Sequence, residues 1–141
     1  MCRVRQSIDF ARAKDYYEHG AALGSSRSAF SLGVMYERGQ GVPLNRKQAT
    51  VWYLQSVRMG HSWAYHKMAQ TLEEGWSGTP NIVGAYSWYA ALATNKKVGD
   101  GEASRAAIKK MEELRPKMTP AQITQAQQIQ AQIQAQIQPN K

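Results

Sequence analysis

The sequence is poor in the residues and segments that form disulfides, membrane spans and secretory signals. Cysteine occurs once, at Cys2, among 141 residues, so no disulfide can form within the chain. No apolar run approaches the roughly 18 residues that a membrane-spanning helix needs. The first ten residues, MCRVRQSIDF, carry charges and lack the apolar centre of a secretory signal. We therefore expect no membrane span and no signal peptide within this sequence.

Combinations of residues that support catalysis or metal binding are also scarce. His61 and His66 are five positions apart, whereas metal ligands on one helix face are separated by three or four. His66 and Glu73 offer a two-ligand half-site at most, and a polar helix surface is the favoured interpretation. The Gly-rich segment 75–79 has no following lysine and does not form a phosphate loop. We predict no metal, no cofactor and no enzymatic activity.

Positive charge is abundant but not concentrated. Eighteen Lys and Arg against ten Asp and Glu give a net charge of +8 and a pI near 9.8. Such a balance is compatible with a nucleic-acid or an acidic partner. Adjacent basic residues occur only in pairs, such as Arg46-Lys47, which favours a solvated basic surface over a dedicated binding patch.

Small and aromatic residues recur at a constant step of 36 positions. The residues that share this step are Ala13, Ala49, Ala85 and Ala121, and the pairs Tyr16-Tyr17, Trp52-Tyr53 and Trp88-Tyr89. Composition alone cannot place so many coincidences in one register, so the chain is predicted to be a repeat array.

Each repeat is predicted to be a pair of helices. Apolar and small residues follow helical spacing over residues 28–36, in a first helix, and over 49–57, in a second helix. Gly39 supplies backbone freedom where the first helix ends, and Pro43 prevents helix in the connection. Asn45 is the expected N-cap of the second helix. The glycines in this stretch are therefore joints between helices rather than parts of an active site.

The repeat resembles the Sel1-like repeat, a relative of the tetratricopeptide repeat, in its bacterial form. The residues that carry the resemblance are Leu32-Gly33, Tyr36, the loop Gly39-Gln40-Gly41-Val42, Ala49, Trp52-Tyr53 and Gly60. Asn45 stands where the family usually has Asp. The resemblance implies an all-α fold, a short right-handed α-solenoid of antiparallel helix pairs closed by a C-terminal capping helix.

We divide the chain into a repeat array over residues 1–126 and a Gln/Ile/Ala-rich extension over 127–141. The repeats are placed at about 9–24, 25–60, 61–98 and 99–126. Continuing the step puts Ser104, Arg105 and Ile108 at the Leu-Gly-Tyr positions of the last repeat. Thr119 is expected to cap the last helix. The extension is predicted either to continue this helix, with fraying after about residue 130, or to be disordered.

The resemblance also implies where a partner would bind, because the first helices line the concave side of this fold in related proteins. Residues of the first helices outside the buried stripe should face that groove, and Trp76 is added from an unusual loop. The predicted partner-binding residues are Arg27, Phe30, Val34, Glu37, Arg38, Trp63, His66, Gln70, Glu73 and Trp76. Lys110 continues the row in the last repeat. Phe30 and Trp63 have the alternative of packing within the array.

The predicted function is a non-catalytic module that binds another protein through this groove. The family resemblance implies an adaptor, a regulator or an immunity-type inhibitor of a secreted toxin, with an effector, envelope or signalling protein as partner. A bacterial chain of this kind would be cytoplasmic or, after removal of a signal, periplasmic. The alternative is RNA binding, which the charge favours and which Glu37 and Glu73 disfavour. Self-association through the extension is a third hypothesis.

Overall fold

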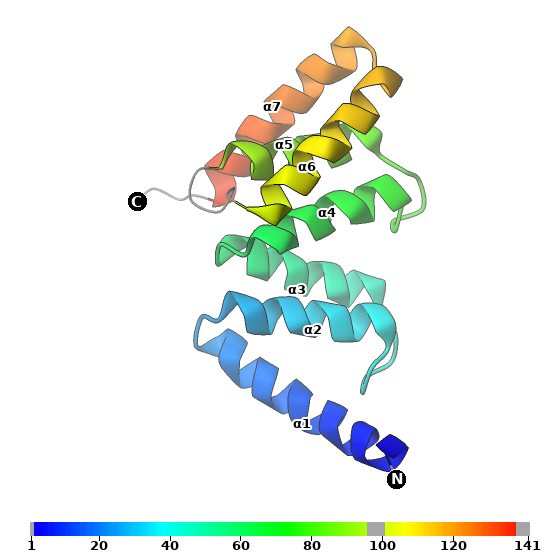
Figure 1. Cartoon of the computed structure of the whole chain (residues 1–141), viewed down its shortest axis with the longest axis vertical. Coiled ribbons are helices and arrows are strands. Elements are labelled where there is room, and N and C mark those ends of the chain that lie inside the picture. The colour runs from blue at the N-terminus through cyan, green and yellow to red at the C-terminus, as the bar shows by residue number, and fades with distance from the viewer. Residues whose placement is uncertain (1, 96–100, 138–141) are drawn as a thin grey trace. The chain divides into compact units, whose positions relative to one another are not determined.

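The computed structural model describes residues 2–95 and 101–137, with side chains from Phe10 onward. Figure 1 traces the helices that these residues form. They are α1 (Cys2–Ala22), α2 (Ser26–Arg38), α3 (Arg46–Arg58), α4 (Ser62–Glu74), α5 (Ile82–Thr94), α6 (Glu102–Leu114), the short 3-10 helix η1 (Arg115–Lys117) and α7 (Pro120–Ile137). The parts of the predicted last repeats and of the extension at 96–100 and 138–141 lie outside the described residues. Among the described residues, no helix is both long enough and apolar enough to cross a membrane.

The chain divides into two compact units, Met1–His61 and Ser62–Lys141. The first contains α1, α2 and α3, and the second contains α4, α5, α6 and α7. Within the first unit α2 packs on both α1 and α3, and within the second unit α5 packs on α4, α6 and α7. The helix of the first predicted repeat, placed at about residues 9–24, begins earlier than expected, because residues 2–8 continue α1 without a break.

Two asparagines one repeat apart begin the second helices. The Oδ1 atom of Asn45 accepts a hydrogen bond from the backbone N–H of Gln48 at 3.0 Å. Asn81 caps α5 in the same way, accepting from the N–H of Gly84 at 2.8 Å. Each side chain satisfies an N–H that the first helical turn leaves without a partner. The predicted N-cap at Asn45 is confirmed.

The ends of α2 and α7 also follow the sequence signals. Gly39 closes α2 in the left-handed conformation, with φ of 68°, and its N–H donates to the carbonyl of Met35. At the start of α7, the Thr119 N–H donates to Gln122 Oε1 at 2.9 Å and the Gln122 N–H donates to Thr119 Oγ1 at 3.1 Å. This reciprocal pair is a capping box, so the predicted start of the last helix is also confirmed.

The tyrosine of each Trp-Tyr pair, rather than the tryptophan, is the fully buried member. Tyr53 and Tyr89 expose none of their surface, whereas Trp52 and Trp88 are half-buried. A Cβ atom added to Gly33 would lie 2.5 Å from the Tyr53 ring. The glycine after the inward Leu32 therefore makes room for the aromatic side chain of the second helix.

The α7 helix covers α5 in the second unit. The buried Ser87 hydroxyl on α5 lies 3.0 Å from the backbone carbonyl of Ala126 on α7. Further along, the side-chain amides of Gln130 and Gln134 both donate to Thr94 Oγ1, at 3.0 and 2.8 Å. Ile133 is buried between these two glutamines in sequence. These contacts explain why α7 continues to Ile137 instead of fraying after about residue 130.

The 36-residue step breaks at α6. This helix begins at Glu102, whereas a constant step from Ser62 would start it at position 98. Its buried residues include Ala103, Ser104 and Ala107, whereas Arg105 and Ile108 are exposed. The longer connection after α5 therefore moves the start of the helix, and of the residues placed at the Leu-Gly-Tyr positions Ser104 is buried whereas Arg105 and Ile108 face solvent.

Gly33→Ala should lower the free energy of unfolding by about 1–3 kcal/mol, because the new methyl group overlaps the fully buried Tyr53 ring. This overlap is expected to outweigh the gain of about 1 kcal/mol in helix propensity. Denaturant unfolding measures the change, with the exposed Gln55→Ala on α3 as the control. An unchanged midpoint would show that the Tyr53 ring moves aside freely.

Ile133→Ala should lower the free energy of unfolding by about 2–5 kcal/mol, since the side chain is buried on the capping helix. The matched control is Gln132→Ala, one position earlier on the same helix and exposed. Chemical denaturation of both variants gives the comparison. Equal stabilities would mean that this part of α7 contributes nothing to the fold, and would return self-association of the extension to consideration.

Candidate functional site

A hydrogen bond from a buried tyrosine links the two helices of a pair in both units. Tyr53 on α3 donates its hydroxyl to Glu37 Oε1 on α2, and Tyr89 on α5 donates to Glu73 Oε1 on α4 at 2.9 Å. The two bonds are one 36-residue step apart. Burial, together with the bonded carboxylate, raises the pKa of both phenols far above the ordinary value of 10.0. Both tyrosines therefore remain protonated donors at neutral pH.

Aromatic rings extend from these tyrosines along the first helices. The Phe30 ring lies 5.4 Å from the Tyr53 ring and 4.7 Å from that of His61. One step later, His66 lies 5.1 Å from Tyr89. Phe30 thus packs within its own unit, as the alternative for this residue allowed.

Trp63 extends the second of these rows toward solvent. Its ring lies 5.3 Å from the His66 ring, and 39% of the residue remains exposed. An exposed indole face beside a half-buried histidine is available for contact with another molecule.

A cavity of about 290 Å³ opens beside this row in the second unit. Its walls come from α4, α5 and α6. The lining residues are His66, Gln70, Glu73, Glu74, Tyr89 and Lys110. We call this cavity the α4–α6 pocket.

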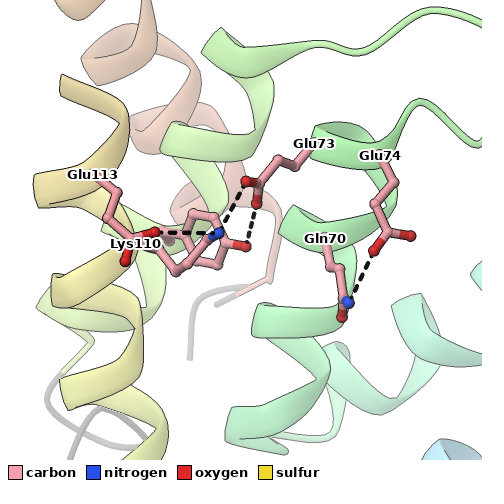
Figure 2. Close-up of polar contacts among 6 residues, drawn as sticks. Gln70, Glu73, Glu74, Lys110 and Glu113 are labelled. Atoms are coloured by element: carbon pink, nitrogen blue, oxygen red, sulfur yellow. Dashed lines mark hydrogen bonds and ion pairs between the residues drawn. The ribbon is translucent and has the colours of Figure 1, made fainter. Parts of the chain in front are cut away.

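Lys110 on α6 and Glu73 on α4 point toward one another across the pocket (Figure 2). The Lys110 Nζ atom lies 2.9 Å from Glu73 Oε2 and 3.5 Å from Glu113 Oε1. The hydrogen bond to Glu73 raises the pKa of Lys110, which therefore stays charged. This ion pair is a polar link between α4 and α6.

Glu74 is held by its neighbours on the other side of the pocket. Its Oε2 atom accepts from the Gln70 side-chain amide at 3.1 Å, and its Oε1 atom accepts from the Trp76 indole at 2.9 Å. Trp76 is half-buried rather than fully exposed in its loop. It reaches the pocket through Glu74.

The protonation state of His66 depends on the groups around it. Its pKa lies below the ordinary 6.5, first because the ring is buried and then because Lys110 and Lys67 repel a second positive charge, while Glu73 opposes the shift. The ring also faces Tyr89, which stays neutral. His66 is therefore neutral at pH 7, and Lys110 carries the positive charge among the lining residues.

The structure gathers part of the predicted set in the pocket. His66, Gln70 and Glu73 line it directly, with Trp63 and Trp76 one contact away. The members on α2 belong to the first unit, where Arg27 and Arg38 are exposed and Val34 is half-buried. That the residues of α2 and those of α4 bind the same partner stays a prediction.

Tyr89 is the pocket residue that the sequence places elsewhere, because its aromatic pair belongs to the buried stripe of the second helix. Glu74 follows Glu73 on the side of α4 that is expected to face the groove. A signal for Tyr89 was present, because Glu37 and Tyr53 recur together one step later as Glu73 and Tyr89. Joint recurrence of a carboxylate and a tyrosine on paired helices indicates a bond between them.

The pocket is suited to polar recognition. Its lining contains no serine, threonine or cysteine that could act as a nucleophile, and its lysine is charged and paired. Among the described residues, no group of three or more His, Cys, Asp and Glu side chains is placed to hold a metal ion.

Acidification should destabilise the chain through His66. Because the folded-state pKa lies below 6.5, the unfolded chain binds more protons as pH falls through 6.5, and the free energy of unfolding decreases. His66→Gln removes this contribution, so its unfolding free energy should fall less steeply from about pH 7 to about pH 5 than that of the wild type. Urea titrations across this range measure both slopes.

Gln70→Ala is the control for this experiment, since it changes the same pocket without removing a titrating group. Its slope should match that of the wild type. A residual slope is expected in every variant from His61, whose pKa is also lowered, by burial and by Arg27. Parallel slopes for His66→Gln and the wild type would contradict the expectation.

Comparison with known proteins places this geometry in a family. The Sel1 repeat matches residues 4–25, 26–61 and 64–96, more than half of the chain. Two curated relatives are each 36% identical: the DAP3-binding cell death enhancer 1 of Rattus norvegicus over 61 residues, and the ERAD-associated E3 ubiquitin-protein ligase component HRD3A of Arabidopsis thaliana over 50 residues. These matches cover 43% and 36% of this chain but only 12% and 7% of the relatives.

A solved structure shares the fold. The protein c5321, described as a protective antigen of uropathogenic Escherichia coli strains with an SLR fold, aligns with a TM-score of 0.78 at 22% identity. The alignment covers 92% of this chain and 26% of that one. The predicted all-α fold of Sel1-like helix pairs is confirmed, and such a fold suggests a module for protein–protein interaction. The chain belongs to the Sel1 repeat family.

Proposed function

We propose that this chain is a non-catalytic module that binds a partner protein through the exposed surfaces of its first helices. The observation that carries the proposal is the α4–α6 pocket, a polar cavity of about 290 Å³ that borders an aromatic row ending in the exposed Trp63. This volume lies at the lower end of small-molecule sites. It suits a side chain presented by a partner better than a cofactor.

The names of the relatives support binding to proteins as the general role. One curated relative is named for binding DAP3, and the other is a component of a ubiquitin ligase. We propose that this chain acts in a comparable way as an adaptor, a regulator or an inhibitor that neutralises a secreted toxin. Its partner would be an effector, an envelope protein or a signalling protein.

RNA binding is the second candidate, and the net charge of +8 favours it. The charges around the α4–α6 pocket disfavour RNA binding at this surface. Glu73 and Glu113 pair with Lys110, and Glu74 is a further carboxylate of the lining, so phosphate groups would be repelled there. An RNA site would have to lie on another surface.

Affinity capture with paired variants tests the proposal. The wild-type chain is immobilised and exposed to lysate and envelope fractions of its source cell, beside a Trp63→Ala/Trp76→Ala variant. The control is Val51→Ala/Gln55→Ala, which changes two exposed residues of the second helix α3. All three chains are first shown to be folded by circular dichroism and thermal melting.

One protein retained by the wild type and by the control, but lost by the double tryptophan variant, is the expected result. Its association rate should fall with salt if the partner is acidic. Equal retention by all three chains would move the site away from α4. Recovery of RNA alone, removed by nuclease, would replace protein binding by the second candidate.

A further inference from the structure

The two repeats keep some residues of the first-helix surface and change the others. Retained at the 36-residue step are the tyrosine and the carboxylate that bind each other, Tyr53 with Glu37 and Tyr89 with Glu73. Four positions differ between the first and the second of these repeats: Arg27 is replaced by Trp63, Phe30 by His66, Val34 by Gln70, and Arg38 by Glu74.

The retained residues support the fold of each repeat, whereas the changed residues alter the surface that each repeat presents. The retained pair joins the helices, and both repeats need it to satisfy a buried hydroxyl. The changed positions lie on the same surface of α2 and α4 but do not serve that bond. In the second repeat they replace two arginines and two apolar side chains by two aromatic rings, an amide and a carboxylate. The surface of α4 is therefore specialised for a different ligand than that of α2.

The specialised surface is acidic within a basic chain. The carboxylates of Glu73 and Glu74 in the lining, and of Glu113 beside it, stand against two ammonium groups, that of Lys110 in the lining and that of Lys67, which acts on His66. A carboxylate offers about four lone-pair positions, and Glu73 meets one donor at each oxygen, the Tyr89 hydroxyl and Lys110. Carboxylates therefore outnumber ammonium groups here, although the whole chain carries +8.

We propose, building on the proposed function, that the α4–α6 pocket binds the guanidinium group of an arginine side chain of the partner protein. A planar guanidinium can donate parallel hydrogen bonds to a carboxylate and can also stack on an aromatic face. The pocket offers both, with the carboxylates of Glu73 and Glu74 and the aromatic ring of His66 in its wall. A lysine ammonium would use the carboxylates without the planar stacking, and an anion would be repelled.

The test uses N-acetyl-arginine methylamide as the probe and N-acetyl-citrulline methylamide as its uncharged equivalent of the same shape. Titrations are followed by nuclear magnetic resonance, through the Trp63 indole N–H and the backbone amides of α4 and α6. Saturable shifts confined to these signals are expected with the arginine probe, and about tenfold weaker binding with citrulline.

Two variants and a matched control define the site. Glu74→Gln keeps the shape and the acceptor oxygen but removes the charge, and should weaken arginine binding about tenfold. His66→Gln should weaken it as well, because it removes the ring in the pocket wall on which the guanidinium stacks. Glu112→Gln removes the same charge from an exposed position of α6 outside the pocket, and should leave affinity within about twofold.

Several results would overturn the arginine site. They are equal shifts by arginine and citrulline, shifts spread over the whole surface, absence of saturation, or equal weakening by Glu74→Gln and Glu112→Gln. Failure of this inference is distinguishable from failure of the proposed function. A partner captured equally by the wild type and by Glu74→Gln would remove the arginine site while leaving protein binding in place.

Discussion

In each helix pair that contains a fully buried tyrosine, the tyrosine hydroxyl must reach an acceptor, and the arrangement of the first-helix surface follows from that requirement. Tyr53 and Tyr89 lose all contact with water, which is costly for a phenol without a hydrogen bond. Each finds a carboxylate 16 positions earlier, Glu37 or Glu73, on the other helix of the pair. The bond fixes how the second helix lies on the first and places an acidic side chain at the edge of the core.

The same carboxylate also joins a third helix and lines the pocket. Glu73 gives one oxygen to Tyr89 and the other to Lys110 of α6. The bond to Tyr89 thereby orients a charged residue of the pocket wall. A half-buried carboxylate held by two donors is a rigid recognition element, because its own rotamer is already fixed before a ligand arrives.

The regular part of the sequence predicted the regular part of the fold. The 36-residue step and its capping residues correctly indicated the helices from α2 to α5, because these two pairs have the same length and the same connections. The 36-residue step did not predict the start of α6. The connection before this helix is longer, and a change in the length of a connection leaves no periodic signal in the sequence. The extent of α7 was equally hidden, because it depends on burial of Ile133 and on bonds to Thr94 rather than on local propensity.

The candidate site was accessible to the same reasoning only in part. His66, Gln70 and Glu73, which the sequence predicts to face one side of α4, all line the pocket, whereas the buried aromatic stripe conceals that Tyr89 is also a pocket wall. In a repeat protein, a residue that recurs serves the unit that recurs, as the Tyr-Glu bond does. A departure such as Arg38 to Glu74 changes the surface while the scaffold stays the same. Specificity in such a chain is therefore to be sought where the repeats disagree, next to the residues on which they agree.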